Sequence, residues 1–266
     1  MRLLDALTAG TRVYDLAQPL ENGMPCSPSH PGFHFALIRR HGDRPTPDGG
    51  SGSNELITLG GHVGTHIDAL AHAAHDGRLH GGLDAAANSV GGRHRALGVD
   101  TVAPMLCRGV LLDIPALHGT GRLAPGCGIT PDDLEAALDG GELNPGDVAL
   151  VRTGWPQLYA DPAAYVGHAT GVPGLTGEAA DWLAAHGVRA AGTDTIAFDR
   201  ILPGLGHTRM PAHRSLLVEH GVHIVEVLDL EELAADGVRE FLFVLVPLKI
   251  LGATGSPVRP LALVEA

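Results

Sequence analysis

Aromatic residues are scarce in this sequence, and long hydrophobic runs are missing. Phe, Trp and Tyr make up 4% of the 266 residues, so we expect a core built mainly of Leu, Val, Ala and Ile. No apolar run reaches the roughly 18 residues typical of a membrane-spanning helix. The first seven residues reach Asp5 without an apolar stretch, which makes them a poor signal peptide. We therefore expect a protein without a membrane segment.

Cysteine is also rare. The three cysteines, Cys26, Cys107 and Cys127, are odd in number and widely spaced, so the sequence implies no disulfide framework. This usage is typical of a reducing compartment, and we predict a cytoplasmic location.

Positive charge is in deficit. Eighteen Lys and Arg residues face 30 Asp and Glu residues, giving a formal net charge of −12. This balance argues against nucleic acid or an anionic membrane as a partner and leaves a small-molecule substrate open. Hydrophobic residues (44%) and charged residues (18%) occur at levels ordinary for a globular protein. With no linker or repeat, we predict one domain over residues 1–266.

Strands and helices are predicted to alternate along most of the chain, which indicates the α/β class. Thr130 followed by Pro131 is typical of a helix start, and Gly187 and Gly221 are typical of helix ends. Residues 21–54 are rich in Pro, Gly, His and Ser and predict an irregular binding loop that decides the substrate. Strands are expected at 11–20, 56–59, 109–114, 147–153, 188–193, 222–228 and 241–250, and helices at 130–140, 176–186 and 211–220.

The most informative segment is a histidine cluster, with six histidines between His62 and His94. His62, His66, Asp68 and His72 are separated by even intervals, so on an extended chain their side chains share one face. Gly60, Gly61 and Gly64 disfavour a helix here. Two imidazoles and a carboxylate on one face suit zinc or manganese. The alternative is a glycine-rich turn with solvated histidines.

The cluster divides into metal ligands and a proton carrier. Three ligands, His62, His66 and Asp68, would leave coordination positions open, as in catalytic sites. His72 could then move a proton between a metal-activated water and a leaving group, although a fourth-ligand role stays open. Thr65 could fix a ligand ring. His75 and His80 lie in a predicted turn and are expected to be bystanders.

Glu226 lies in a predicted apolar strand, where a carboxylate is costly unless it is paired or binds a metal. His213 precedes it on a predicted helix. A salt-bridged or strand-end glutamate is the alternative to a metal ligand.

The segment His62-Val-Gly-Thr-His66-Ile-Asp68 followed by His72 resembles the signature of the cyclase-like metal hydrolases, which include bacterial kynurenine formamidase and isatin hydrolase. The likeness covers nearly the whole chain. Two departures are Leu70, where the family commonly has proline, and Ser27, about where kynurenine formamidases carry a substrate-packing tryptophan. Further matches in family order are Tyr14-Asp15-Leu16, residues 23–25, 151–155, 192–194 with Asp199, 213–226 and 256–259.

This resemblance implies a swivelling β/β/α-type fold, a mixed sheet with flanking helices, and a homodimer or homotetramer. It implies that His62, His66 and Asp68 hold Zn²⁺ or Mn²⁺ and that His72 carries the proton. In the formamidase branch Asp68, His213 and Glu226 would hold a second ion, so one or two ions per chain are expected.

The sequence thus predicts a metal-dependent amidohydrolase that cleaves a non-peptide C–N bond of an amide, lactam or cyclic imide. Metal-activated water would attack the carbonyl, with His72 as acid and base. The alternatives are a kynurenine formamidase proper, a lactone hydrolase or cyclase of secondary metabolism, and a non-catalytic metal-dependent binding protein.

Overall fold

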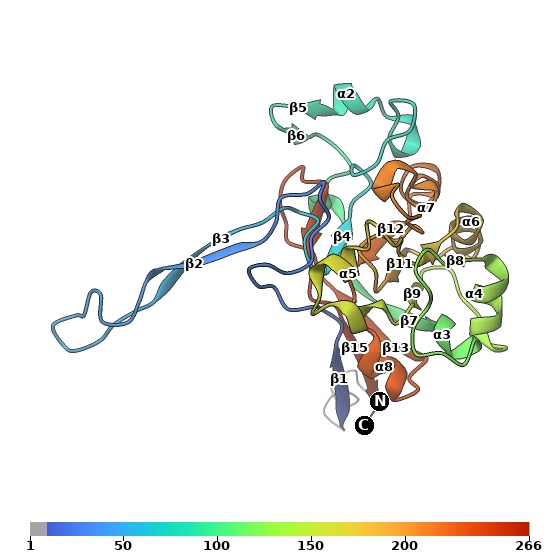
Figure 1. The fold of residues 1–266 in the computed structure, drawn as a ribbon. Helices are drawn as coiled ribbons and strands as arrows, with labels where there is room; N and C mark the ends of the chain where they lie inside the picture. The colour runs from blue at the N-terminus through green and yellow to red at the C-terminus, as the bar shows by residue number, and fades with distance from the viewer. Residues whose placement is uncertain (1–9, 266) are drawn as a thin grey trace.

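A strongly curled, nine-stranded mixed sheet forms the centre of the computed structural model, which describes residues 10–265 (Figure 1). The predicted α/β class with a mixed sheet is confirmed. The central strand pairs β7–β9, β9–β11 and β11–β12 are parallel, and the pairs outside them are antiparallel. In spatial order the strands are β1 (Thr11–Asp15), β15 (Leu261–Glu265), β13 (Glu240–Leu245), β7 (Met105–Asp113), β9 (Val148–Arg152), β11 (Ala190–Thr193), β12 (His223–Glu226), β4 (His66–Asp68) and β14 (Gly255–Pro257).

The longer helices begin and end close to where the sequence predicts. Thr130 caps α4 (Pro131–Leu138) in a reciprocal capping box with Asp133. Helix α6 (Gly177–Ala185) begins after the cap residue Thr176. Helix α7 (Pro211–His213) continues as a π-helical segment over Arg214–His220 and ends at Gly221, which has a positive φ. The remaining helices are short: α2 (Ala85–Asn88), α3 (Ile114–Leu117), α5 (Pro162–Val166), α8 (Glu231–Ala235) and 3₁₀ turns at His80–Gly82, Val99–Thr101, Trp155–Leu158 and Gly206–Thr208.

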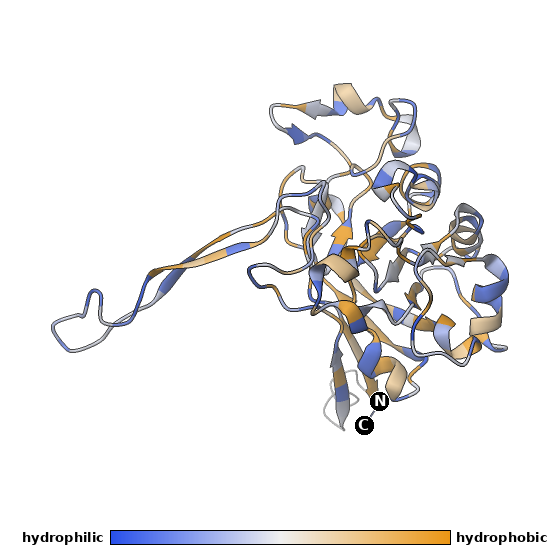
Figure 2. Ribbon diagram, viewed as in Figure 1, coloured by the Kyte–Doolittle hydropathy of each residue, from blue (hydrophilic) through white to orange (hydrophobic). Residues whose placement is uncertain are grey.

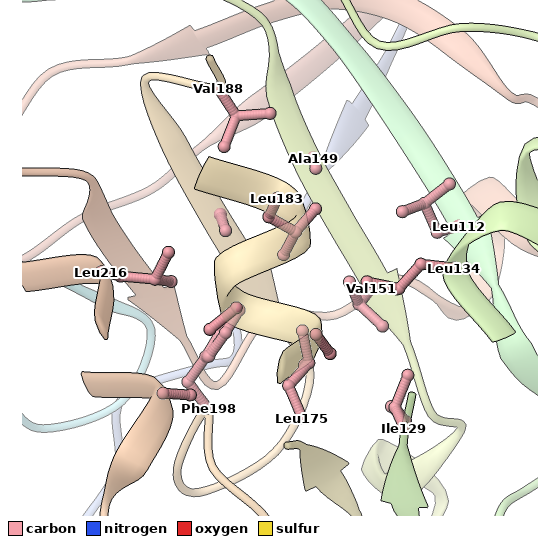
Figure 3. Close-up of a cluster of buried hydrophobic side chains, with 14 of the residues drawn as sticks. Leu112, Ile129, Leu134, Ala149, Val151, Leu175, Leu183, Val188, Phe198 and Leu216 are labelled. Atoms are coloured by element: carbon pink, nitrogen blue, oxygen red, sulfur yellow. The ribbon is translucent and has the colours of Figure 1, made fainter. Parts of the chain in front are cut away.

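Both faces of the sheet are buried. On one face Leu112 and Val151 pack against Leu134 of α4 and Leu183 of α6 (Figure 3). The alternate strand residues, such as Leu150, point to the opposite face and form a second core. Because neighbouring residues of a strand point to opposite faces, these strands read as continuous apolar runs.

An antiparallel hairpin arm, β2 (His34–Arg39) with β3 (Asn54–Thr58), projects away from the sheet (Figure 1). The prediction of an irregular loop over 21–54 is therefore wrong for the arm. The 56–59 strand is present but pairs only with β2. All the residues of both strands are exposed, including Phe35, Ile38 and Leu56, and Figure 2 shows these apolar positions along the arm.

Other boundaries differ in detail. The strand predicted at 241–250 ends at Leu245, and the residues beyond it form a loop. Three two-stranded sheets lie outside the main sheet: the arm, β5 (Ser89–Val90) with β6 (Arg93–His94), and β8 (Gly128–Ile129) with β10 (Gly174–Leu175).

The three cysteines are free thiols. None of the helices within residues 10–265 is long and apolar enough to cross a membrane.

Candidate metal centre

The register of strands β12 and β4 places the carboxylate of Glu226 beside the imidazole of His66. In the antiparallel pair β12–β4, Glu226 lies directly opposite His66. Directly opposed residues of an antiparallel pair share a face and lie close together. Asp68, two residues after His66, lies on that same face. One short strand and its neighbour therefore position three ionisable side chains.

The even spacing of the cluster is not the reason that the other members converge. Only His66–Asp68 is extended; His62 lies in the preceding turn, and His72 lies in the turn that follows. The His62 ring folds back over β4 to reach Asp68 because Gly255 opposite leaves room. A Cβ at Gly255 would lie 2.5 Å from Cε1 of His62. The convergence was predicted correctly, but from a single extended segment that the chain does not form.

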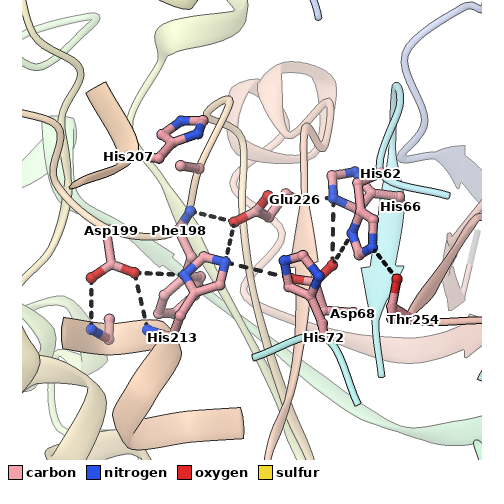
Figure 4. A network of polar contacts seen from close by, with 12 residues as sticks. His62, His66, Asp68, His72, Phe198, Asp199, His207, His213, Glu226 and Thr254 are labelled. Carbon is pink, nitrogen blue, oxygen red and sulfur yellow. Dashed lines mark hydrogen bonds and ion pairs between the residues drawn. The ribbon is translucent and has the colours of Figure 1, made fainter. Parts of the chain in front are cut away.

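His213 comes to the same place from helix α7. Its helix start is held by Asp199, whose carboxylate accepts hydrogen bonds from the backbone N–H groups of Ala212 (2.6 Å) and His213 (3.0 Å). The same carboxylate accepts from Nδ1 of His213 at 2.6 Å. This arrangement aims Nε2 of His213 at the carboxylates of the sheet (Figure 4).

Asp68 is the centre of the cluster, and it is fully buried. Its Oδ1 lies 2.6 Å from Nδ1 of His62 and 3.6 Å from Nε2 of His66. Its Oδ2 lies 3.5 Å from Nε2 of His213 and 4.0 Å from Nε2 of His72. All six residues singled out in the sequence therefore meet around one carboxylate once Glu226 is included.

Glu226 lies between the rings of His66 and His213 and contacts both. Its Oε2 is 3.4 Å from Nε2 of His66, and its Oε1 is 3.3 Å from Nε2 of His213. Oε1 also accepts a hydrogen bond of 2.6 Å from the backbone N–H of Phe198. Glu226 is the last residue of β12 and pairs with two histidines, as the alternative of a salt-bridged or strand-end glutamate has it, but it is buried and lies within the cluster.

Three of the imidazoles have one nitrogen facing the carboxylates and the other held by a fixed partner. His66 Nδ1 lies 2.8 Å from the Gly64 carbonyl, His62 Nε2 lies 2.9 Å from Thr254 Oγ1, and His213 Nδ1 binds Asp199. This is the usual arrangement of metal-binding histidines. The expected role of Thr65 is wrong: its hydroxyl donates to the Val227 carbonyl and accepts from Gln18 N–H, so it ties loops together.

His72 differs from these rings. Its side chain is 23% exposed, whereas those of His62, His66 and His213 are 4–8% exposed. Its ring lies against that of His62, with centroids 3.9 Å apart. Neither of its nitrogens makes a hydrogen bond within residues 10–265. His72 is thus the cluster member with most access to solvent.

The charges of the site are strongly coupled. Burial opposes ionisation of Asp68 and Glu226, but the surrounding imidazoles hold the pKa of Asp68 well below its ordinary value and lower that of Glu226. Burial alone would lower the pKa of His66 and His213, yet their carboxylate partners raise both pKa values. Burial lowers the pKa of His72 to about 4. The site therefore favours two anions and needs positive charge beside them.

A divalent cation fits this need. Oδ2 of Asp68 is buried without a hydrogen-bond partner in the described part of the chain, although a buried carboxylate oxygen is normally satisfied. Donor atoms of two sets, His62–Asp68–His72 and His66–Asp68–Glu226, lie within 4.8 Å of one another. Donors around a tetrahedral zinc ion are about 3.3 Å apart. In the second set Nε2 of His66 lies 3.6 Å from Asp68 Oδ1 and 3.4 Å from Glu226 Oε2. Both sets share Asp68.

Cation binding should weaken as the pH falls, because protons compete for His66 and His213. The raised pKa values mean that proton-dependent stabilisation of the metal-free protein is complete below the ordinary histidine pKa and is lost as the pH rises through the raised values. The stabilisation by added Zn²⁺ or Mn²⁺ should have the opposite pH dependence and increase from about pH 6 to about pH 8. Thermal unfolding with and without the ion measures it. A stabilisation independent of pH would contradict proton competition.

Replacing Asp199 with asparagine should weaken cation binding by about 10–100-fold without unfolding the protein. Asparagine keeps one acceptor for the α7 backbone but removes the charge that fixes the His213 ring. Calorimetric titration with Zn²⁺ measures the loss. Asp132→Asn, on the exposed side of α4, is the matched control and should bind as the parent does. Equal affinities for both variants would rule out the orienting role.

A cavity of about 320 Å³ opens above the cluster. Two histidines that the sequence analysis did not single out line it. His30 stacks on His62 at 5.0 Å between ring centroids, and His207 comes from the 3₁₀ turn before α7. Only residues 25–30 of the predicted binding loop reach the cavity; the arm does not. His75 and His80 lie outside the cavity, as expected of bystanders.

Comparisons with known proteins show the family of this chain. The Cyclase family model matches residues 14–200. Isatin hydrolase of Roseibium aggregatum is 31% identical over 140 residues, which cover 51% of this chain and 52%, about half, of that protein. Kynurenine formamidase of Bacillus cereus is 27% identical over 246 residues, covering 92% of this chain and 94% of that protein.

Solved structures show the same relationship. A crystal structure described as a novel cyclase superimposes with a TM-score of 0.86 at 30% identity, covering 98% of this chain and 92% of that one. Isatin hydrolase A from Ralstonia solanacearum gives a TM-score of 0.76 at 28% identity, covering 100% and 98%. With a family model matched over most of its length, this chain belongs to the Cyclase family and is related to the kynurenine formamidases and isatin hydrolases.

Proposed function

We propose that this protein is a metal-dependent amidohydrolase that adds water across the C–N bond of an amide, lactam or cyclic imide. The observation that carries the proposal is the buried carboxylate of Asp68, which has one oxygen without a hydrogen bond and is surrounded by imidazoles that line a cavity. Its relatives isatin hydrolase and kynurenine formamidase are amidohydrolases, which supports the reaction class.

We assign the ligands as the family resemblance implies. His62, His66 and Asp68 would hold the catalytic ion, and Asp68, His213 and Glu226 would hold a second if one binds, whereas the donor atoms in this structure group His62 with His72 and His66 with Glu226 around Asp68. A bound Zn²⁺ or Mn²⁺ would lower the pKa of a water molecule and polarise the substrate carbonyl. The other nitrogens of His62, His66 and His213 are already fixed, so these rings need little reorganisation to act as ligands.

His72 is the proposed proton carrier. With a pKa lowered to about 4, its ring is neutral near pH 7 and can accept a proton at a ring nitrogen. Its side chain lines the cavity and contacts solvent, so it can pass that proton to the departing nitrogen. Asp68, 4.0 Å away, would stabilise the transient imidazolium.

Metal analysis of protein purified without chelators, followed by a substrate panel, tests the proposal. The panel holds lactams, cyclic imides, formamides including N-formylkynurenine, and lactones. Turnover of C–N substrates that stops on chelation and returns with the ion is expected. Turnover of lactones alone would favour the lactone hydrolase or cyclase. Ligand binding that neither needs the ion nor leads to hydrolysis would exclude an enzyme and a metal-dependent binding protein alike.

Four further expectations remain predictions: the swivelling β/β/α form of the fold, a homodimer or homotetramer, a cytoplasmic location, and the absence of nucleic-acid and membrane partners. Light scattering of the purified protein tests the oligomer directly.

A further inference from the structure

One side of the cavity is polar and has no Phe, Tyr or Trp side chain among the described residues. Ser27, Ser29 and His207, which we call the polar wall, line it. The apolar lining comes from small or aliphatic side chains such as Val63, Ile196 and Met210. No Phe, Tyr or Trp within residues 10–265 lines the cavity, so a flat aromatic ring would find imidazoles but no aromatic platform.

The polar wall is a built feature. Ser27 Oγ lies 2.8 Å from Ser29 Oγ and 3.1 Å from Nδ1 of His207, which is 180 residues away in the sequence. Ser27 is buried, and its carbonyl accepts a turn hydrogen bond of 3.0 Å from the backbone N–H of His30. The turn that places His30 over the cluster therefore also places Ser27 against His207.

Hydrogen-bonding capacity remains on this wall. Nε2 of His207 makes no hydrogen bond to any residue between 10 and 265. The Ser27 hydroxyl has three partners, Ser29 Oγ, His207 Nδ1 and the Ser29 backbone N–H at 3.4 Å, which fill its capacity of one donor and two acceptors. It therefore acts on a ligand by fixing the His207 ring, whose Nε2 is left to bind the ligand. An apolar ring edge pressed against this nitrogen would leave it unpaired, which disfavours binding.

The same three residues also set the extent of the cavity. A second cavity of about 190 Å³ is lined by Ser27, Ser29 and His207 together with Val166 and Ile201. The polar wall thus stands between the two cavities. A ligand held at the cluster meets hydrogen-bonding groups at its far edge instead of an open apolar slot.

We propose that His207, positioned by Ser27, determines specificity and selects a compact, non-aromatic cyclic amide that carries a hydrogen-bonding group able to reach Nε2 of His207. The inference rests on the proposed function for the reaction at the cluster. It concerns recognition, however, and can be measured by binding alone.

Three probes separate the parts of this inference. Hydantoin has an extra ring N–H that succinimide replaces with CH₂, and phthalimide is succinimide with a fused benzene ring. Calorimetric binding to protein purified without chelators should rank hydantoin first, succinimide second and phthalimide last. The first step should be about two- to tenfold, the range for one neutral hydrogen bond gained, and the second about five- to 100-fold, the range for a buried group left without its hydrogen bond. Hydrolysis of the three compounds is measured in parallel.

Two substitutions of Ser27 test whether the polar wall causes the preference for hydantoin over succinimide. Ser27→Ala should remove most of the preference for hydantoin over succinimide, mainly through KM where turnover occurs, whereas Ser27→Thr, which keeps the hydroxyl, should retain it. Phthalimide binding as tightly as hydantoin, or no binding of any probe, would overturn the proposal. So would a preference that Ser27→Ala leaves unchanged. Ranked binding without hydrolysis would support the recognition and overturn the proposed hydrolase.

Discussion

Replacing Asp68 with asparagine should abolish cation binding and hydrolysis together. Asp68 belongs to both donor sets of the site, and its carboxylate contacts His62, His66 and His213. Asparagine has nearly the same shape, so what is lost is the negative charge and one anionic oxygen. The affinity for Zn²⁺ or Mn²⁺ should fall by more than about 100-fold, beyond the loss expected for an outer partner such as Asp199.

Metal analysis, calorimetric titration and turnover on the best substrate of the panel measure the effect. Asp147→Asn provides the matched control, because Asp147 is also buried but pairs with Arg108 far from the cavity. That variant should keep its metal and its turnover. An Asp68→Asn protein that retains stoichiometric metal would show that Asp68 is not a ligand and would remove the main support for the proposed function.

The chemistry of the site could be predicted from the sequence because its central residues are close together in the chain. His62, His66 and Asp68 lie within seven residues, so no long-range contact had to be known. Glu226 could be singled out because an acidic residue in an apolar strand needs a partner. That its partner is His66 depends on the β12–β4 register, which local sequence patterns do not determine.

The residues that were missed reach the site through tertiary structure. His30 lies in a loop rich in Pro and Gly, where no periodicity marks one residue above its neighbours. His207 lies in a 3₁₀ turn, and only its contact with Ser27 shows that it faces the cavity. The signal available for both was the abundance of histidine itself, which does not distinguish them from His75 or His220.

The hairpin arm shows why local composition did not predict its strands. Residues 34–39 and 54–58 form strands, although their surroundings are rich in turn residues. Gly, Pro, Ser and Asp concentrate between the strands, at the tip, so a window over the whole segment predicts a loop. The short apolar runs Phe35-Ala-Leu-Ile38 and Leu56-Ile57 were the better guide, since β-branched and aromatic residues favour strands.

Replacing His72 with alanine should lower kcat by about 10²–10⁴-fold, the usual contribution of a general acid–base group, while the metal content stays unchanged. His72 is the most exposed ring of the cluster and has no fixed hydrogen-bond partner within the described chain, unlike His62, His66 and His213. A ligand ring is normally held by such a partner, and a proton carrier needs access to substrate and solvent.

The same experiment tests the alternative that His72 is a metal ligand. His72 also belongs to the His62–Asp68–His72 donor set, so as a fourth ligand it would take the metal with it when removed. Metal content and kcat are therefore measured on the same preparation, with His75→Ala, a half-exposed histidine outside the cavity, as the control. Retained metal, a large fall in kcat, little change in KM and partial rescue by added imidazole would identify a proton carrier. Loss of metal in proportion to activity would instead make His72 a ligand and leave the proton transfer to another group on the cavity wall.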